Sequence, residues 1–370
     1  MKKRMFVEIK PELLRNLREI FGFSKEQVAK KLQTSQTKIE QIEKGELPLT
    51  LSQLKKLAKL YRVSLALFFS ESLPKLPTVP DYRLNRERKL NPEVFIAQKK
   101  AYYLARELGS LTDKRSTIPY HLHQLDAIQL AKSFRKILDI ELIKNKPAKE
   151  ILQKYKSYIE DKMFVPVIEH PLKAEDVRAF SIHGDVCIIV LNEEDAPEVK
   201  LFSLFHEVAH LLKKTGALCS IDLEIESTEV ETFCNRFAAE FLVPADDLRE
   251  EIAKRKLEHF DQAAVNELAG VYGVSKQVIM LRLLWLNYIR RETYVEFKRR
   301  YEQLERQQEK AEEHKKGFGR RNWTEVFFNR AGGLVITEMK KAYKRGDITL
   351  SDIITSLEIR AKYVEKFVEG

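Results

Sequence analysis

The segment His206-Glu207-Val208-Ala209-His210 carries the strongest chemical pattern in the chain. On a helix, histidines four residues apart stand on one face, one turn apart, so both imidazoles can reach the same metal ion. Glu207, one step around the helix, can address a water bound to that ion. The neighbouring apolar side chains indicate a buried helix: Leu201, Leu204, Phe205, Val208, Leu211 and Leu212. Two histidines and a glutamate in the interior predict a zinc site.

A catalytic zinc site needs a third protein ligand and an open position for water. Five glutamates follow closely enough to supply that ligand: Glu224, Glu226, Glu229, Glu231 and Glu240. A helix through this region would bury a stripe formed by Val230, Phe233, Phe237 and Phe241. Glu231 and Asn235, four residues apart, would form an adjoining polar stripe, which favours Glu231 as the ligand and a structural role for Glu240.

Short β-branched and aromatic runs predict a small sheet just before this helix. They span residues 164–168, 179–182 and 186–191, and His183-Gly184-Asp185 forms a turn between the last two. The rest of the chain has helical patterns, so we expect a mainly α fold with a small β-sheet, of the α+β class. His183 is conceivable as an oxyanion donor, although a lone surface histidine is the simpler interpretation.

Residues 10–70 predict several short helices with tight turns, with no need for a strand. Ser24 opens one helix as a cap, and residues 34–45 form a turn and a second helix that ends at Gly45. Two short helices in this arrangement fit an all-α helix-turn-helix domain over residues 1–70. We expect its DNA contacts to come from Lys25, Gln36, Thr37, Lys38 and Gln41.

The charge distribution agrees with a polyanionic partner at two places. Residues 1–75 hold 16 Lys and Arg against 8 Asp and Glu, and residues 291–345 hold 15 against 9, within a total of +10. The alternative to DNA binding is that the N-terminal module keeps this helical fold but uses it for contacts with proteins. Because helix-turn-helix modules commonly bind DNA as dimers, a homodimer is compatible with the module.

Pro74, Pro77 and Pro80 mark a linker over residues 71–90 between two domains. Residues 268–283 have the shape of a second helix-turn-helix, for which we favour structural packing. Residues 290–316 are most simply a solvated helix. We expect residues 291–370 to form a helical C-terminal region.

The chain has 44% hydrophobic and 32% charged residues, which indicates folded, soluble domains. No run of about 18 apolar residues and no signal peptide is present, so we expect a cytoplasmic protein without membrane contact. The three cysteines, Cys187, Cys219 and Cys234, lack a paired spacing and predict buried thiols rather than disulfides.

Residues 206–212 and 231–244 resemble the ImmA/IrrE family of metallopeptidases. That family has a His-Glu-x-x-His helix followed by a Glu-x-x-Ala-Asn-x-Phe-Ala-Ala-Glu-Leu-Leu-x-Pro helix. The resemblance implies His206, His210 and Glu231 as zinc ligands and Glu207 as general base. Cys234 stands where alanine is usual, a change that we expect not to disturb ligation.

Two further stretches strengthen the resemblance. The segment Pro80-Asp81-Tyr82-Arg83 resembles the Pro-Asp-Phe-Arg segment that often precedes this domain in fused members. Residues 8–70, including the turn Glu43-Lys44-Gly45, resemble the lambda-repressor-like XRE family. Together these resemblances imply a zincin-like metallopeptidase domain over residues 91–290 behind a DNA-binding domain.

Two functions follow from this combination. The first is a zinc metallo-endopeptidase that cleaves a transcription repressor or similar regulator at few sites. The second is a DNA-binding regulator or antitoxin that neutralises a cognate toxin by binding it, with a structural or vestigial metal site. The intact peptidase residues favour the first, and the basic N-terminal module favours the second.

Overall fold

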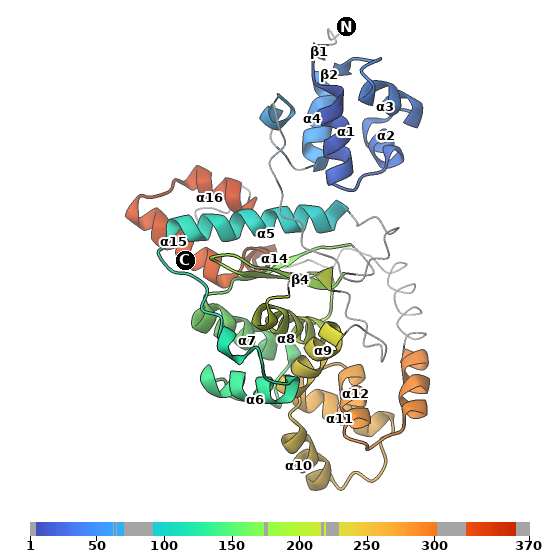
Figure 1. The fold of residues 1–370 in the computed structure, drawn as a ribbon, viewed down its shortest axis with the longest axis vertical. Coiled ribbons are helices and arrows are strands. Elements are labelled where there is room, and N and C mark those ends of the chain that lie inside the picture. The colour runs from blue at the N-terminus through green and yellow to red at the C-terminus, as the bar shows by residue number, and fades with distance from the viewer. Residues whose placement is uncertain are drawn as a thin grey trace.

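The computed structural model describes residues 5–61, 63, 65–69, 92–173, 177–215, 218–219, 229–301 and 323–359. The predicted linker over 71–90, with Pro80-Asp81-Tyr82-Arg83, lies outside the described residues. So do Glu224, Glu226 and residues 302–316 of the predicted solvated helix; the described residues 291–301 are helical. The mainly helical α+β architecture expected from the sequence is confirmed (Figure 1).

The N-terminal domain is a cluster of short helices around its own apolar core. Its elements are β1 Phe6–Val7, α1 Pro11–Ile20, α2 Lys25–Leu32, α3 Gln36–Glu43, β2 Leu49–Thr50, α4 Leu51–Tyr61 and the 3-10 helix η1 Leu65–Phe69. β1 and β2 pair antiparallel over two residues each, a small strand pair that the helical pattern of residues 10–70 did not predict. Serine caps define the helix-turn-helix, since Ser24 caps α2 in a capping box with Gln27 and Ser35 caps α3.

A four-stranded sheet forms the centre of the larger part of the chain. Its strands are β3 Val167–His170, β4 Ala179–Ile182, β5 Ile188–Asn192 and β6 Leu218–Cys219, in the order β3-β5-β4-β6. β3 lies parallel to β5, and the other pairs are antiparallel. Every residue of β3, β4 and β5 is buried, which means that both faces of the sheet are covered.

Two layers of helices cover the sheet, and the side chains of β5 alternate between the two cores. Ile188 and Val190 point into one core and Ile189 and Leu191 into the other, as the alternation of a strand requires. The first layer contains α5 Pro92–Leu111, α14 Trp323–Ala331, α15 Gly333–Arg345 and α16 Leu350–Leu357. The second contains α6 Ala127–Ile137, α7 Ala148–Met163, α8 Pro197–Lys213, α9 Glu229–Leu242, α11 Gln262–Tyr272 and α12 Lys276–Trp285, with α10 Ala245–Arg255 and the 3-10 helix η2 Tyr120–Leu122 beside them.

Helices α14, α15 and α16 pack against strands that lie more than a hundred residues earlier in the sequence (Figure 1). Glu160 of α7 accepts a hydrogen bond from the backbone N–H of Val167 at 3.1 Å, and burial raises the pKa of this carboxyl. Gly332, with φ +82°, lies so close that a Cβ atom there would stand 3.2 Å from the Val167 carbonyl. The helices at residues 323–357 of the predicted C-terminal region therefore help to cover one face of the sheet.

α5 also contacts the N-terminal domain. Ile96 near its start belongs to the N-terminal core, and the ammonium of Lys99 lies 5.6 Å from the ring centre of Phe21. Ala97, Ala101, Leu104 and Leu108 of the same helix pack on the sheet. One continuous helix thus joins the two cores. Among the described helices, none is both long and apolar enough to span a membrane.

Candidate metal centre

α8 holds the His-Glu-x-x-His motif in the interior. It begins at Pro197, packs on β4 and β5, and ends at Lys213; the next residue, Lys214, adopts a left-handed conformation with φ 55°. Every residue from Lys200 to Leu212 is buried, and the exposed fraction is 0% for His206, Glu207 and His210. The prediction of a buried helix is confirmed.

Three side chains of α8 and α9 converge at one point. The Nε2 atoms of His206 and His210 lie 3.1 Å apart. Glu231 of α9 brings Oε2 to 3.1 Å from Nε2 of His206 and Oε1 to 3.6 Å from Nε2 of His210. Ligand atoms of a tetrahedral zinc ion, with bonds of about 2.0–2.1 Å, lie about 3.4 Å apart. The donor set therefore fits zinc in both chemistry and spacing.

The other nitrogen of each histidine has a fixed partner. Nδ1 of His206 lies 2.9 Å from Oδ1 of Asn235, and Nδ1 of His210 lies 3.1 Å from Oγ1 of Thr215. Both oxygens can accept, so each ring can carry its proton on Nδ1 and keep the Nε2 lone pair for a metal ion. The polar stripe on α9 pointed to Asn235, whereas no pattern in the sequence singled out Thr215.

Two models of protein families match parts of the chain. Residues 160–284 match the family model of the IrrE N-terminal-like domain, which is named as a peptidase family, and residues 12–68 match that of a helix-turn-helix domain. The chain joins an ImmA/IrrE-like domain to an XRE-like helix-turn-helix. No curated protein matches the chain in a sequence search.

A thiol lies beside the histidines of the ImmA/IrrE-like domain. Cys234 of α9 is fully buried, and its Sγ groups with the ligand atoms of His206 and His210, all within 4.8 Å of one another. Either Glu231 or Cys234 could therefore supply the third donor. Glu231 is the better placed, because its carboxylate oxygens lie 3.1 and 3.6 Å from the two Nε2 atoms, close to the separation expected between zinc ligands. The sulfur of Cys234 lies within a wider limit of 4.8 Å from the histidine ligand atoms.

Buried ion pairs fasten the two helices of the site to the rest of the domain. Glu169 of β3 accepts from Lys200 of α8 at 2.7 Å and from Lys156 of α7 at 3.2 Å. Burial alone would raise the pKa of Glu169, but the two ammonium groups outweigh it and lower that pKa. On α9, Glu240 pairs with Arg282 of α12 and accepts from the backbone of Ala245, contacts that suit a structural residue.

Two details of the sequence prediction need correction. Val230, placed on the buried stripe of α9, is 38% exposed; it lies in the first described turn of α9. His183 follows β4 and is half-buried rather than on the surface; burial and the charge of Lys214 lower its pKa. No hydrogen bond or ion pair among the described residues joins His183 to His206 or His210.

The helix-turn-helix presents part of the predicted DNA face. Gln36, Thr37 and Lys38 are exposed in the first turn of α3, and Gln41 is partly exposed one turn later. Lys25 donates a hydrogen bond to Glu40 at 2.7 Å, which ties the start of α2 to α3. The polar, exposed first turn of α3 is a surface that a major groove can accept.

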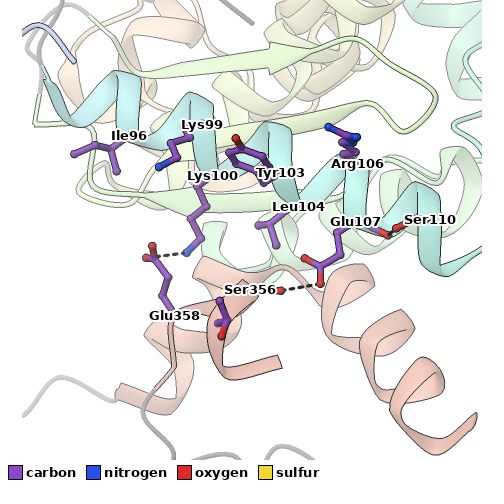
Figure 2. Close-up of a pocket in the computed structure, with 11 residues that line it drawn as sticks. Ile96, Lys99, Lys100, Tyr103, Leu104, Arg106, Glu107, Ser110, Ser356 and Glu358 are labelled. Atoms are coloured by element: carbon purple, nitrogen blue, oxygen red, sulfur yellow. Dashed lines mark hydrogen bonds and ion pairs between the residues drawn. The ribbon is translucent and has the colours of Figure 1, made fainter. Parts of the chain in front are cut away.

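A pocket of 680 Å³ lies apart from these residues, between α5 and α16 (Figure 2). Glu358 lies 3.8 Å from Lys100 across it, and Ser356 donates to Glu107 at 2.7 Å. None of the residues that line this pocket belongs to α8 or α9. These contacts attach α16 and Glu358 to α5.

Proposed function

We propose that the chain is a zinc-dependent endopeptidase that cleaves a transcription repressor or similar regulator at few sites. The observation that carries this proposal is the convergence of His206, His210 and Glu231, whose facing atoms lie 3.1 to 3.6 Å apart. These three side chains would hold the ion. When bound, zinc supplies a Lewis acid for the scissile carbonyl and lowers the pKa of a water to about 7.

Glu207 performs the proton transfers. Its carboxylate takes a proton from the attacking water and passes it to the leaving amine as the peptide C–N bond breaks. The products are a new carboxyl end and a new amino end. Asn235 and Thr215 keep the two imidazole rings in one orientation, so that the site needs little rearrangement when a substrate arrives.

The helix-turn-helix supplies the regulatory half of the proposal. With Gln36, Thr37 and Lys38 exposed on α3, this domain would place the chain on double-stranded DNA, where repressors also bind. The same exposed face supports a second function: a regulator or antitoxin that neutralises a toxin by binding it while holding its own promoter. In that case the metal would serve the fold alone.

Cleavage of a co-expressed regulator distinguishes the two functions. When the chain is co-expressed with a regulator from a neighbouring gene, we expect the wild type to produce a fragment of that regulator. The cleavage rate should be at least about 10²-fold lower with Glu207→Gln. Glu229→Gln, an exposed glutamate on α9, is the matched control and should cleave like the wild type. Intact regulator with all three proteins would favour the binding function.

Metal analysis tests the site independently of any substrate. The purified wild type should contain about one zinc per chain, because structural and catalytic zinc sites each hold a single ion. His206→Ala should lose most of it, while His259→Ala, an exposed histidine on the loop after α10, should retain it. Equal zinc in the two variants would contradict the assignment of His206.

A further inference from the structure

Cys234 is placed as a donor by the same helix that supplies Glu231. The two residues are three positions apart on α9, so they lie on one face, one turn apart. α8 contributes its donors in the same way, from His206 and His210. The four side chains are at most 1% exposed, and the sulfur lies within 4.8 Å of the histidine ligand atoms.

The chemistry of a thiol favours coordination at this distance. With a Zn–S bond of about 2.3 Å and a Zn–N bond of about 2.0 Å, sulfur and nitrogen ligands of a tetrahedral ion lie about 3.6 Å apart. The 4.8 Å bound on the sulfur is about 1.2 Å wider than that separation, so coordination requires the Cys234 side chain to move towards the histidines. Thiolate is also a soft ligand that zinc binds strongly.

We propose that Cys234 is a fourth protein ligand, which gives the site a closed resting state. This inference rests on the proposed zinc site. His206, His210, Glu231 and Cys234 would then hold the ion together, with Cys234 bound as the thiolate. Four protein ligands are typical of structural zinc sites, whereas catalytic sites keep one position for water. A site held by four protein ligands would leave no position for the water that Glu207 activates, until Cys234 gave up its place.

Cys187 provides the contrast within the same chain. It is also buried, but its sulfur donates to the carbonyl of Gly184 at 3.6 Å, and burial raises the pKa of its thiol. It does not belong to the cluster of metal-binding side chains found among the described residues. Cys187→Ala is therefore the matched control for Cys234→Ala.

The test uses cobalt, which replaces zinc and absorbs light. The full chain, stripped of metal and loaded with Co²⁺, should show thiolate-to-cobalt charge-transfer absorption in the near ultraviolet. The band should persist in Cys187→Ala and disappear in Cys234→Ala and Cys234→Ser. In competition with a chelator, the zinc dissociation constant should rise at least tenfold for Cys234→Ala and stay unchanged for Cys187→Ala.

The outcomes separate this inference from the function beneath it. Cobalt that binds the wild type without the charge-transfer band overturns the role of Cys234 and leaves the His206, His210 and Glu231 site intact. A wild type that binds neither cobalt nor zinc overturns the proposed function and this inference together. Circular dichroism of each variant establishes that it is folded, and the wild-type spectrum decides the question without any substitution.

Discussion

Two helix pairs in this chain, α2–α3 and α11–α12, share their local structure. Ser35 caps α3 by accepting from the backbone of Lys38 at 3.4 Å, and Ser275 caps α12 by accepting from Val278 at 3.3 Å. The first helix of each pair is followed by a left-handed residue, Gln33 with φ 57° and Gly273 with φ 63°. Caps and turns of this kind set the angle between two short helices.

The pairs differ in what surrounds the second helix. α3 buries only Ile39 and Ile42 of its eight residues, whereas α12 buries Val278, Ile279, Met280, Leu281, Arg282 and Leu283 of its ten. α3 therefore keeps a polar face for a partner, and α12 is part of the domain core. Local sequence chemistry determines the shape of such a pair, and its apolar content determines whether a surface is left for DNA.

The largest difference in stability between variants of α12 and of α3 is expected at Arg282 of α12. Arg282→Ala leaves the carboxylate of Glu240 buried without its cationic partner, which should lower the free energy of unfolding by about 3–5 kcal/mol. Lys38→Ala on the exposed side of α3 should change it by less than about 0.5 kcal/mol. Urea unfolding followed by circular dichroism measures both.

A double variant sharpens this prediction. Arg282→Met with Glu240→Leu removes both charges, and much of the lost stability should return because no uncompensated ion remains. Should Arg282→Ala cost less than Lys38→Ala, α12 would not be the core helix that its burial indicates.

An intermediate effect is expected at the two left-handed residues. At Gly273 a Cβ atom would stand 2.6 Å from Cδ1 of Ile151 and 3.2 Å from Cα of Ala148. Gly273→Ala should therefore destabilise the chain by about 2–4 kcal/mol, from the left-handed backbone and from overpacking. Gln33→Gly should change stability by at most about 1 kcal/mol, because relief of strain offsets the flexibility of glycine in the unfolded state. Thermal unfolding of both variants gives the comparison, and similar shifts would refute it.

Much of this architecture follows from short-range patterns. The buried helix around His206 and His210, the small sheet and the serine caps at Ser24 and Ser35 all depend on residues within about two turns of one another, which a sequence displays directly. The polar stripe of Glu231 and Asn235 favoured Glu231 as a third ligand from the next helix, and the family resemblance implied the same residue. The sequence therefore predicted the helices of the candidate site and most of the strands.

What escaped prediction depends on distant partners. The pairing of β2 with β1 involves two-residue strands, too short to produce an alternating pattern. The predicted burial of Val230 was wrong because a periodic stripe does not reveal which of its positions other elements cover. Thr215 becomes a partner of His210 only through the left-handed turn at Lys214. The packing of residues 323–359 on the sheet joins segments more than a hundred residues apart, and periodicity carries no such information.

The smallest effect on stability, and the most specific effect on function, is expected on α3. Gln36→Ala combined with Gln41→Ala should leave the unfolding temperature unchanged, since both side chains are at least partly exposed. If α3 enters the major groove, each lost amide contact to a base costs about 1–3 kcal/mol of discrimination. The double variant should then lose its preference for DNA selected by the wild type from a random library, while it still binds DNA non-specifically at low salt. Gln277→Ala, at the equivalent start of α12, should keep that preference. Band shifts with selected and scrambled DNA make the measurement, and a double variant with intact preference would show that α3 and α12 do not differ in the way their burial indicates.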